Sequence, residues 1–351
     1  MRFSWRATLS LCTLAFLLVS LADRSHTAWF AARALAFLVC LVLARTDRPA
    51  FLYTLAAAFA AIAAAGFNGF DFALASLAFS SLNPKLRHLA RLCASIASLA
   101  TLSLLYTFFE PDWTPVFFPF HNRNHYAVFC ELSLPLLVYT WRRSRGNLYL
   151  YIAAMMLLGA LAGGSRVGAI LLLLESCALA AAVLGREKLL FAAPATAIAA
   201  SLFLILAGGA RITDPFVGDH RFEIWRSSLQ MLAARPLAGW GAGDFPRIYP
   251  AFALFDNGQF VNAAHSDWLE WAVEFGLPST LGFLAIFLWW IRKSIHFYPS
   301  WGILISALHA TVDFPFHLPA FLVFAAALAG SIQSNGPSIE AESTDRQRRN
   351  P

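Results

Sequence analysis

An arginine at the start of a predicted helix is the first residue of this sequence that could bind a charged ligand. The segment DHRFEIWRSSLQMLAARP, residues 219–236, predicts a helix with Asp219 as its N-cap and Pro236 after its end. Arg221 falls in the first turn, where free backbone N–H groups and the helix dipole favour an anion, so this end could hold a phosphate. The alternative is an interfacial arginine whose guanidinium reaches lipid headgroups.

The same predicted helix carries an apolar face. Phe222, Trp225, Leu229 and Leu232 recur at helical spacing, so the helix would lie on a membrane or pack over membrane-spanning helices. The segment GWGAGDF follows at 239–245. It predicts a tight turn, because no strand precedes it and its glycine spacing differs from that of a nucleotide-binding loop.

A second polar cluster occupies the segment NAAHSDWLEWAVEFG, residues 262–276, at the start of a long apolar run. Ser266 is a suitable N-cap for a helix with Asp267 in its first turn. The two tryptophans of the segment are typical of the depth of a membrane interface. His265 lies just before this helix, and taken alone it would be an interfacial histidine without a role.

Other ionisable residues gather near the ends of apolar runs. His121 and His125 are four residues apart, but the intervening NRN predicts a loop and no third ligand is evident, so we predict no metal site. Arg166 begins an apolar run after GGS. Asp313 and His317 flank FPF at the end of another run, where Asp313 would cap a helix or pair with an arginine.

Two glutamates, Glu131 and Glu175, lie inside apolar runs. An unpaired charge at the centre of a membrane costs at least about 2.5–3.5 kcal/mol. We therefore expect both side chains to be protonated or paired, with a structural role as well supported as a catalytic one.

The composition indicates which kind of fold must position these residues. Hydrophobic residues make up 59% of the 351 residues and charged residues only 13%, whereas a soluble domain carries about 25% charged residues. Several apolar runs approach the roughly 17–20 residues that a bilayer-spanning helix needs, and they lack the alternation of a membrane barrel. The sequence therefore predicts an all-α polytopic membrane protein, and its scattered basic residues do not indicate a nucleic-acid partner.

About twelve apolar runs are candidates for transmembrane helices, the weakest being 71–82, which is short for a full crossing. The runs are 7–22, 28–44, 49–66, 71–82, 89–109, 126–141, 147–163, 167–184, 189–207, 274–291, 298–312 and 318–333.

The distribution of Lys and Arg predicts the orientation of these helices. With the N-terminus inside, alternation places 17 of the 26 basic residues on the inner side, which fits the positive-inside rule and predicts that both termini are cytoplasmic. The long segment 208–273 then becomes an outer loop. We expect N-terminal spans over 1–114, a catalytic membrane domain over 115–333 that includes this loop, and a disordered cytoplasmic tail over 334–351.

Several motifs, taken in order, resemble the O-antigen ligase and Wzy polymerase superfamily. They are FHNRNHYAVFCELSLPLL, GSRVGAILLLL, HRFEIWRSSLQMLAARPLAGWGAGDF, HSDWLEWAVEFGLPSTLGF and HATVDFPFHLPAF. The resemblance covers roughly residues 115–330, and the order of the motifs makes it specific.

This resemblance implies a membrane glycosyltransferase of the C type in the inner (cytoplasmic) membrane. It implies transfer of a glycan from a polyprenyl pyrophosphate carrier at the outer face, to a glycan or lipid acceptor, without a cofactor. Arg166 and Arg221 would hold the pyrophosphate, with Arg123 as a weaker candidate. Arg221 would also act in catalysis, His265 would activate the acceptor hydroxyl, and Asp313 and His317 are supporting candidates.

Three alternatives remain open at this point. Within the superfamily, the protein could be a ligase onto a lipid or protein, or a polymerase. It could instead be a transporter or flippase for lipid-linked sugars, although such a protein would show repeated halves and charges near the bilayer midplane. An inactive relative would show departures at Arg221 or His265.

Overall fold

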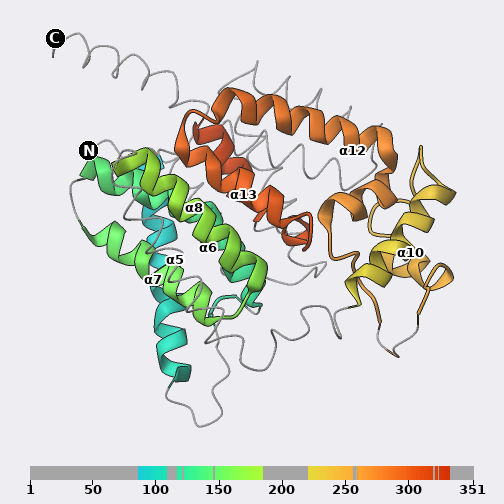
Figure 1. Cartoon of the computed structure of the whole chain (residues 1–351), viewed down its shortest axis with the longest axis horizontal. Helices are drawn as coiled ribbons and strands as arrows, with labels where there is room; N and C mark the ends of the chain where they lie inside the picture. The colour runs from blue at the N-terminus through green and yellow to red at the C-terminus, as the bar shows by residue number, and fades with distance from the viewer. Residues whose placement is uncertain are drawn as a thin grey trace, which may run out of the picture.

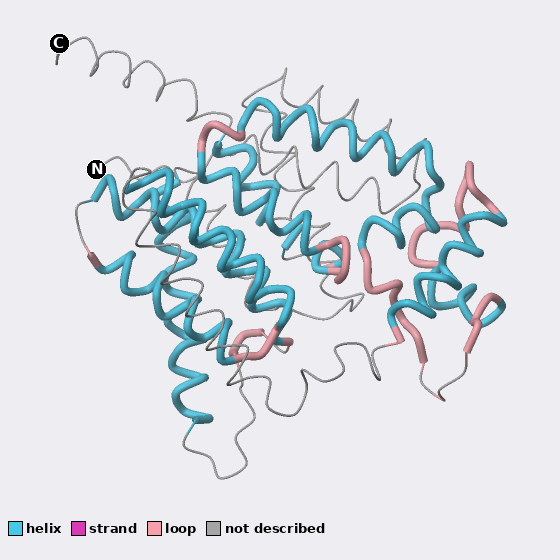
Figure 2. Tube along the Cα trace, viewed as in Figure 1, coloured by secondary structure: helices cyan, strands magenta, loops and turns pink. Residues whose placement is uncertain are grey.

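The computed structural model describes residues 86–108, 117–120, 122–144, 147–184, 220–255, 258, 260–318, 321–322 and 324–332. Within these ranges the regular elements are helices, and the β-structure is a single isolated bridge between Phe117 and Phe120 (Figure 2). The expected spans at 7–22, 28–44, 49–66, 71–82 and 189–207 and the tail at 334–351 lie outside the described residues, as do His121 and Asp219.

The helices follow the predicted apolar runs closely. Their bounds are Leu86–Phe108 (α5), Arg123–Ser144 (α6), Leu148–Ala162 (α7), Arg166–Leu184 (α8), Arg221–Ala234 (α10), Phe245–Ile248 (α11), Asp267–Ser294 (α12) and Trp301–His309 (α13), with short 3-10 helices at Tyr249–Ala251 (η1), Tyr298–Ser300 (η2) and Pro315–His317 (η3). A further helical stretch covers 324–332. The NRN segment was wrongly predicted as loop throughout, because α6 already begins at Arg123 and places His125 on a helix.

Three of the described helices are long and apolar enough to cross a membrane, namely Leu86–Thr107, Arg166–Val183 and Asp267–Ser294. The apolar helix α7 has 15 residues, and the 9 residues of α13 extend only about 14 Å at 1.5 Å per residue. The described part of the chain therefore has the character of an all-helical membrane protein, and the count of about twelve spans stays a prediction.

Helix α6 is the centre of a bundle and contacts α5, α7, α8 and α13 (Figure 1). Glycines allow two of these neighbours to approach closely. A Cβ atom on Gly168 of α8 would lie 2.4 Å from Ala127 Cβ, and one on Gly302 of α13 would lie 2.6 Å from the Glu131 carbonyl oxygen. Small residues at helix contacts are typical of membrane bundles, where close packing replaces the hydrophobic driving force.

A second, smaller core lies where α10, α11 and η1 pack on the first part of α12 (Figure 1). Its buried members are Ile224, Met231, Phe245, Tyr249, Ala264 and Val273. Helix α12 is kinked inside this region, since Gly276 has a non-helical φ of 79°. The kink separates the part of α12 that carries the polar cluster from the apolar part that follows.

Two details of the predicted 219–236 helix need correction. The helix begins at Arg221, and its N-cap is His220, in a left-handed conformation with φ of 43°, where Asp219 was predicted as the cap. The predicted apolar face is only partly exposed: Phe222 and Leu229 are exposed, whereas Leu232 packs against the smaller core. The buried residues of the helix are Ile224, Ser227, Ser228 and Met231.

Candidate functional site

The loop after α13, residues 310–318, contacts the starts of three helices. From α10, Arg221 Nη1 donates a hydrogen bond to the Val312 carbonyl oxygen. From α6, Asn124 Nδ2 donates to Asp313 Oδ2 at 2.5 Å. From α12, the Asp267 N–H lies 2.9 Å from the Ala310 carbonyl oxygen and 3.0 Å from that of Asp313. This loop therefore collects residues that are far apart in the sequence.

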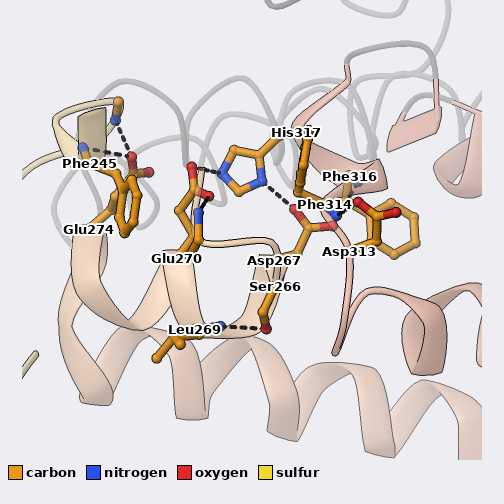
Figure 3. A network of polar contacts seen from close by, with 12 residues as sticks. Phe245, Ser266, Asp267, Leu269, Glu270, Glu274, Asp313, Phe314, Phe316 and His317 are labelled. Atoms are coloured by element: carbon orange, nitrogen blue, oxygen red, sulfur yellow. Dashed lines mark hydrogen bonds and ion pairs between the residues drawn. The ribbon is translucent and has the colours of Figure 1, made fainter. Parts of the chain in front are cut away.

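The start of α12 is built as predicted around Ser266. Its backbone is extended, and its hydroxyl oxygen accepts the Leu269 N–H at 3.3 Å, which is the geometry of an N-cap (Figure 3). Asp267 in the first turn is fully buried. One of its carboxylate oxygens accepts the Phe316 N–H at 2.8 Å, so the helix start is tied to the loop by its side chain as well as its backbone.

His317 lies between two buried carboxylates of α12 (Figure 3). Its Nδ1 pairs with Asp267, and its Nε2 lies 3.2 Å from Glu270 Oε1. His317 was predicted as a candidate site residue, but its partner Glu270 was not. The signal was available in principle, because acidic residues three apart share one face of a helix.

His265 occupies a strained position beside this cluster. Its φ of 52° is left-handed, which is uncommon for a residue with a side chain. The flanking backbone is fixed, since the Ala264 N–H donates to Glu270 Oε2 at 2.8 Å and Ser266 caps α12. Strain of this kind persists where the surroundings over-determine it, which is common at functional sites.

The imidazole of His265 packs edge-on against Phe314, with ring centroids 5.2 Å apart. Its Nδ1 is buried. His125 from α6 also contacts the Phe314 ring, at 6.4 Å. Phe314 thus lies between a histidine of α6 and the histidine that precedes α12.

Arg123 and Arg166 lie at the end of the bundle where α6 and α8 begin. Both are exposed. Arg123 Nη1 lies 3.9 Å from the position that a Cβ atom on Gly164 would take, two residues before Arg166. Because Asn124 follows Arg123 and binds Asp313, this end of the bundle adjoins the 310–318 loop.

The predicted tight turn at 239–245 is confirmed and proves to be bound to the kink of α12. The Trp240 and Gly241 N–H groups donate to the Val273 and Glu274 carbonyl oxygens, each at 3.0 Å. The buried Glu274 carboxylate accepts the N–H groups of Gly243 at 2.9 Å and Phe245 at 3.4 Å (Figure 3). The glycine turn and the kink of α12, two separate motifs in the sequence, therefore form one packed unit.

The same turn carries an exposed ion pair. Arg247 donates two hydrogen bonds to the Asp244 carboxylate, at 3.0 and 2.9 Å. These bonds lower the pKa of Asp244 below its ordinary value. The pair is well exposed, so it contributes little to stability.

The two glutamates inside the bundle differ in their surroundings. Glu131 is paired, since its Oε1 lies 2.7 Å from His309 Nδ1, and both side chains are buried. Glu175 is buried too, and among the described residues neither of its carboxylate oxygens has a hydrogen-bond partner. For Glu131 the second of the two predicted states, pairing, is therefore the one observed.

Residues 151–287 match the family model for O-antigen ligase. The O-antigen ligase match confirms the resemblance drawn from the motifs, and it contains Arg166, Arg221 and His265. Arg123, Asp313 and His317 lie outside the matched residues. A search of curated proteins found no match to this chain.

Proposed function

We propose that this chain is a membrane glycosyltransferase that transfers a glycan from a polyprenyl pyrophosphate carrier to a lipid or glycan acceptor. The reaction would take place at the outer face of the cytoplasmic membrane, with a C-type architecture. The observation that carries the proposal is the O-antigen ligase match, because it contains Arg166, Arg221 and His265. The contacts of Arg221 and His265 with one loop give these residues a common location.

The arginines are suited to hold the donor. Pyrophosphate is a competent leaving group, so the enzyme mainly needs fixed positive charge around it. Arginine supplies that charge permanently and can bind two phosphate oxygens at once. Arg221 would meet the pyrophosphate from the start of α10, where the helix dipole adds to its charge, while the Val312 carbonyl holds its guanidinium. Arg166 and Arg123 would act from the starts of α8 and α6.

His265 is the proposed base. The acceptor hydroxyl oxygen forms a bond to the anomeric carbon of the donor, and the bond from that carbon to the pyrophosphate oxygen breaks with its electron pair. The hydroxyl proton goes to His265. Since His265 Nδ1 is buried, we assign the role to Nε2. The carrier pyrophosphate leaves, and atoms and charges balance without a cofactor.

The test is transfer by the purified full chain from a lipid-linked glycan in detergent. A positioned base typically contributes about 10²–10⁴ in rate, so His265→Ala should lose activity on that scale while still binding the donor. His125→Ala is the matched control, because His125 contacts the same Phe314 ring but has no proposed proton transfer. If His265→Ala, corrected for folded protein, kept near-native turnover, the base would be misassigned. The length of the product separates a ligase from a polymerase.

A further inference from the structure

The outward surface of α10 is divided lengthwise into an apolar and a polar half. Phe222 and Leu229 are both 55% exposed, and seven residues apart they lie on the same face of the helix. Glu223 and Gln230 are also exposed and lie on the next face, about 100° away. The buried residues of α10 lie on its opposite side. The apolar half is therefore available for a contact with something outside the described helices.

Exposed apolar residues also occur on the turn that follows α10 and on the neighbouring part of α12. After α10 the chain turns through Leu237, which is 74% exposed. This turn lies against the kink of α12, since the Leu277 N–H donates to the Pro236 carbonyl oxygen at 2.8 Å. Leu277 is exposed, and so is Leu281 one turn further along α12. Exposed apolar side chains therefore occur on both sides of the contact between this turn and α12.

The length of α12 places this junction at the edge of a bilayer. The part after the kink, residues 277–294, extends about 27 Å, close to the roughly 30 Å of the hydrocarbon core. Its far end carries Arg292 and Lys293, which fits the cytoplasmic side. Leu277 and Leu237 then lie where the hydrocarbon of the other leaflet begins. Helix α10 contacts α12 (Figure 1).

We propose that α10 is an interfacial helix whose Phe222, Leu229 and Leu237 side chains enter the acyl region of the outer phospholipid leaflet. Amphipathic helices bury their apolar face at this depth and leave the polar face in water. The partner is the bilayer that α12 would cross, because the exposed Leu237 after α10 lies at the contact with α12, where the exposed Leu277 begins its apolar segment. The proposal depends on the membrane character of α12 and is independent of glycosyl transfer.

This placement has a consequence for the arginine at the start of α10. Arg221 precedes Phe222, so a lipid-inserted Phe222 would hold Arg221 at the level of the lipid phosphates. A pyrophosphate on a membrane-anchored carrier lies at that same level. The helix would thus set the depth at which the protein meets a lipid-bound anion.

The test places the photoreactive residue p-benzoyl-phenylalanine at four positions of the full chain, one at a time. Positions 222 and 229 probe the apolar half, and positions 223 and 230 are matched controls on the polar half. Each protein is reconstituted into vesicles of phosphatidylethanolamine and phosphatidylglycerol, irradiated, and examined for phospholipid adducts by mass spectrometry. At position 222 one aromatic side chain replaces another, which keeps the test usable if the variant at 229 does not fold.

We expect phospholipid adducts at 222 and 229 at a level at least about ten-fold above that at 223 and 230, because a benzophenone reacts only with the C–H bonds it touches. Equal labelling at all four positions, or no adducts, would overturn the proposal. Cross-links from 222 or 229 to a second copy of the chain would also overturn it, and would identify the apolar half as a dimer contact. Transfer activity is not the readout, so the result is separate from that of the His265 experiment.

Discussion

The backbones of Gly239 and Gly276 lie directly against each other. A Cβ atom on Gly239 would sit 2.7 Å from the Gly276 nitrogen and 2.3 Å from the Glu274 carbonyl oxygen, and one on Gly276 would sit 2.2 Å from the Leu237 carbonyl oxygen. The glycine turn and the kink of α12 are therefore a single joint. It fixes α10, which carries Arg221, against the helix that follows His265.

Alanine at either glycine should destabilise the protein. Both residues have positive φ, which alone costs about 1–2 kcal/mol for a residue with a Cβ atom, and the clash with backbone adds to that. Gly258→Ala is the control, since Gly258 also has positive φ but nothing lies within 4 Å of its Cβ position. Thermal unfolding in detergent should show a larger loss for Gly239→Ala and Gly276→Ala. Equal losses for all three variants would mean that close packing contributes nothing.

Removing the Glu274 carboxylate should loosen the same joint. Glu274→Ala leaves the N–H groups of Gly243 and the buried Phe245 without their acceptor. An unsatisfied buried group costs about 1–3 kcal/mol. Glu274→Gln retains an amide oxygen and should lose less. Limited proteolysis of the 240–260 region measures the effect, and equal cleavage of both variants would contradict a role as hydrogen-bond acceptor.

Lysine at position 221 should weaken donor use without removing the base. Arg221→Lys keeps the charge but loses the planar fork that reaches two oxygens, so KM for the lipid-linked donor should rise. Arg226→Lys is a suitable control, because Arg226 is exposed on the same helix and has no proposed donor contact. Steady-state kinetics over a range of donor concentrations separates KM from kcat. An unchanged KM would reject the donor contact.

Transfer should survive chelation of divalent cations. If arginines neutralise the pyrophosphate, a metal ion has no charge left to stabilise, and EDTA should leave the initial rate unchanged. The measurement is product formation before and after dialysis against EDTA. Activity lost on chelation and restored by manganese or magnesium would reject the metal-free mechanism and bring His121 and His125 back as ligands.

The Lys and Arg distribution predicts that the loop containing Gly258 faces outward and that Asn335 faces the cytoplasm. Single cysteines at these two positions, in a background without the five native cysteines, can be labelled in intact cells with a membrane-impermeant reagent. Position 258 should react and position 335 should not. The reverse pattern would overturn the orientation.

Features that depend on neighbouring residues could be predicted from the sequence, whereas contacts between residues far apart in the chain could not. Ser266 could be identified as a cap because its partner, Leu269, is three residues away. The pairing of Asp313 with Asn124 spans 189 residues, and that of His317 with Asp267 spans 50; neither has a local pattern. The helical spacing of apolar residues likewise predicted an apolar face on α10, but it could not predict which part of the protein or its surroundings that face contacts. Asp219 was misjudged because the left-handed turn at His220 starts the helix later than residue type suggests.

The position of the 310–318 loop in the chain has a consequence for biogenesis. Arg221 and His265 are both synthesised before the loop that contacts them. During insertion into a membrane, Arg221 and His265 therefore first lack their contacts with the loop. These contacts can form only after α13 and the loop have been synthesised. The proposed transfer activity would thus appear only after residues 310–318 have been made and inserted.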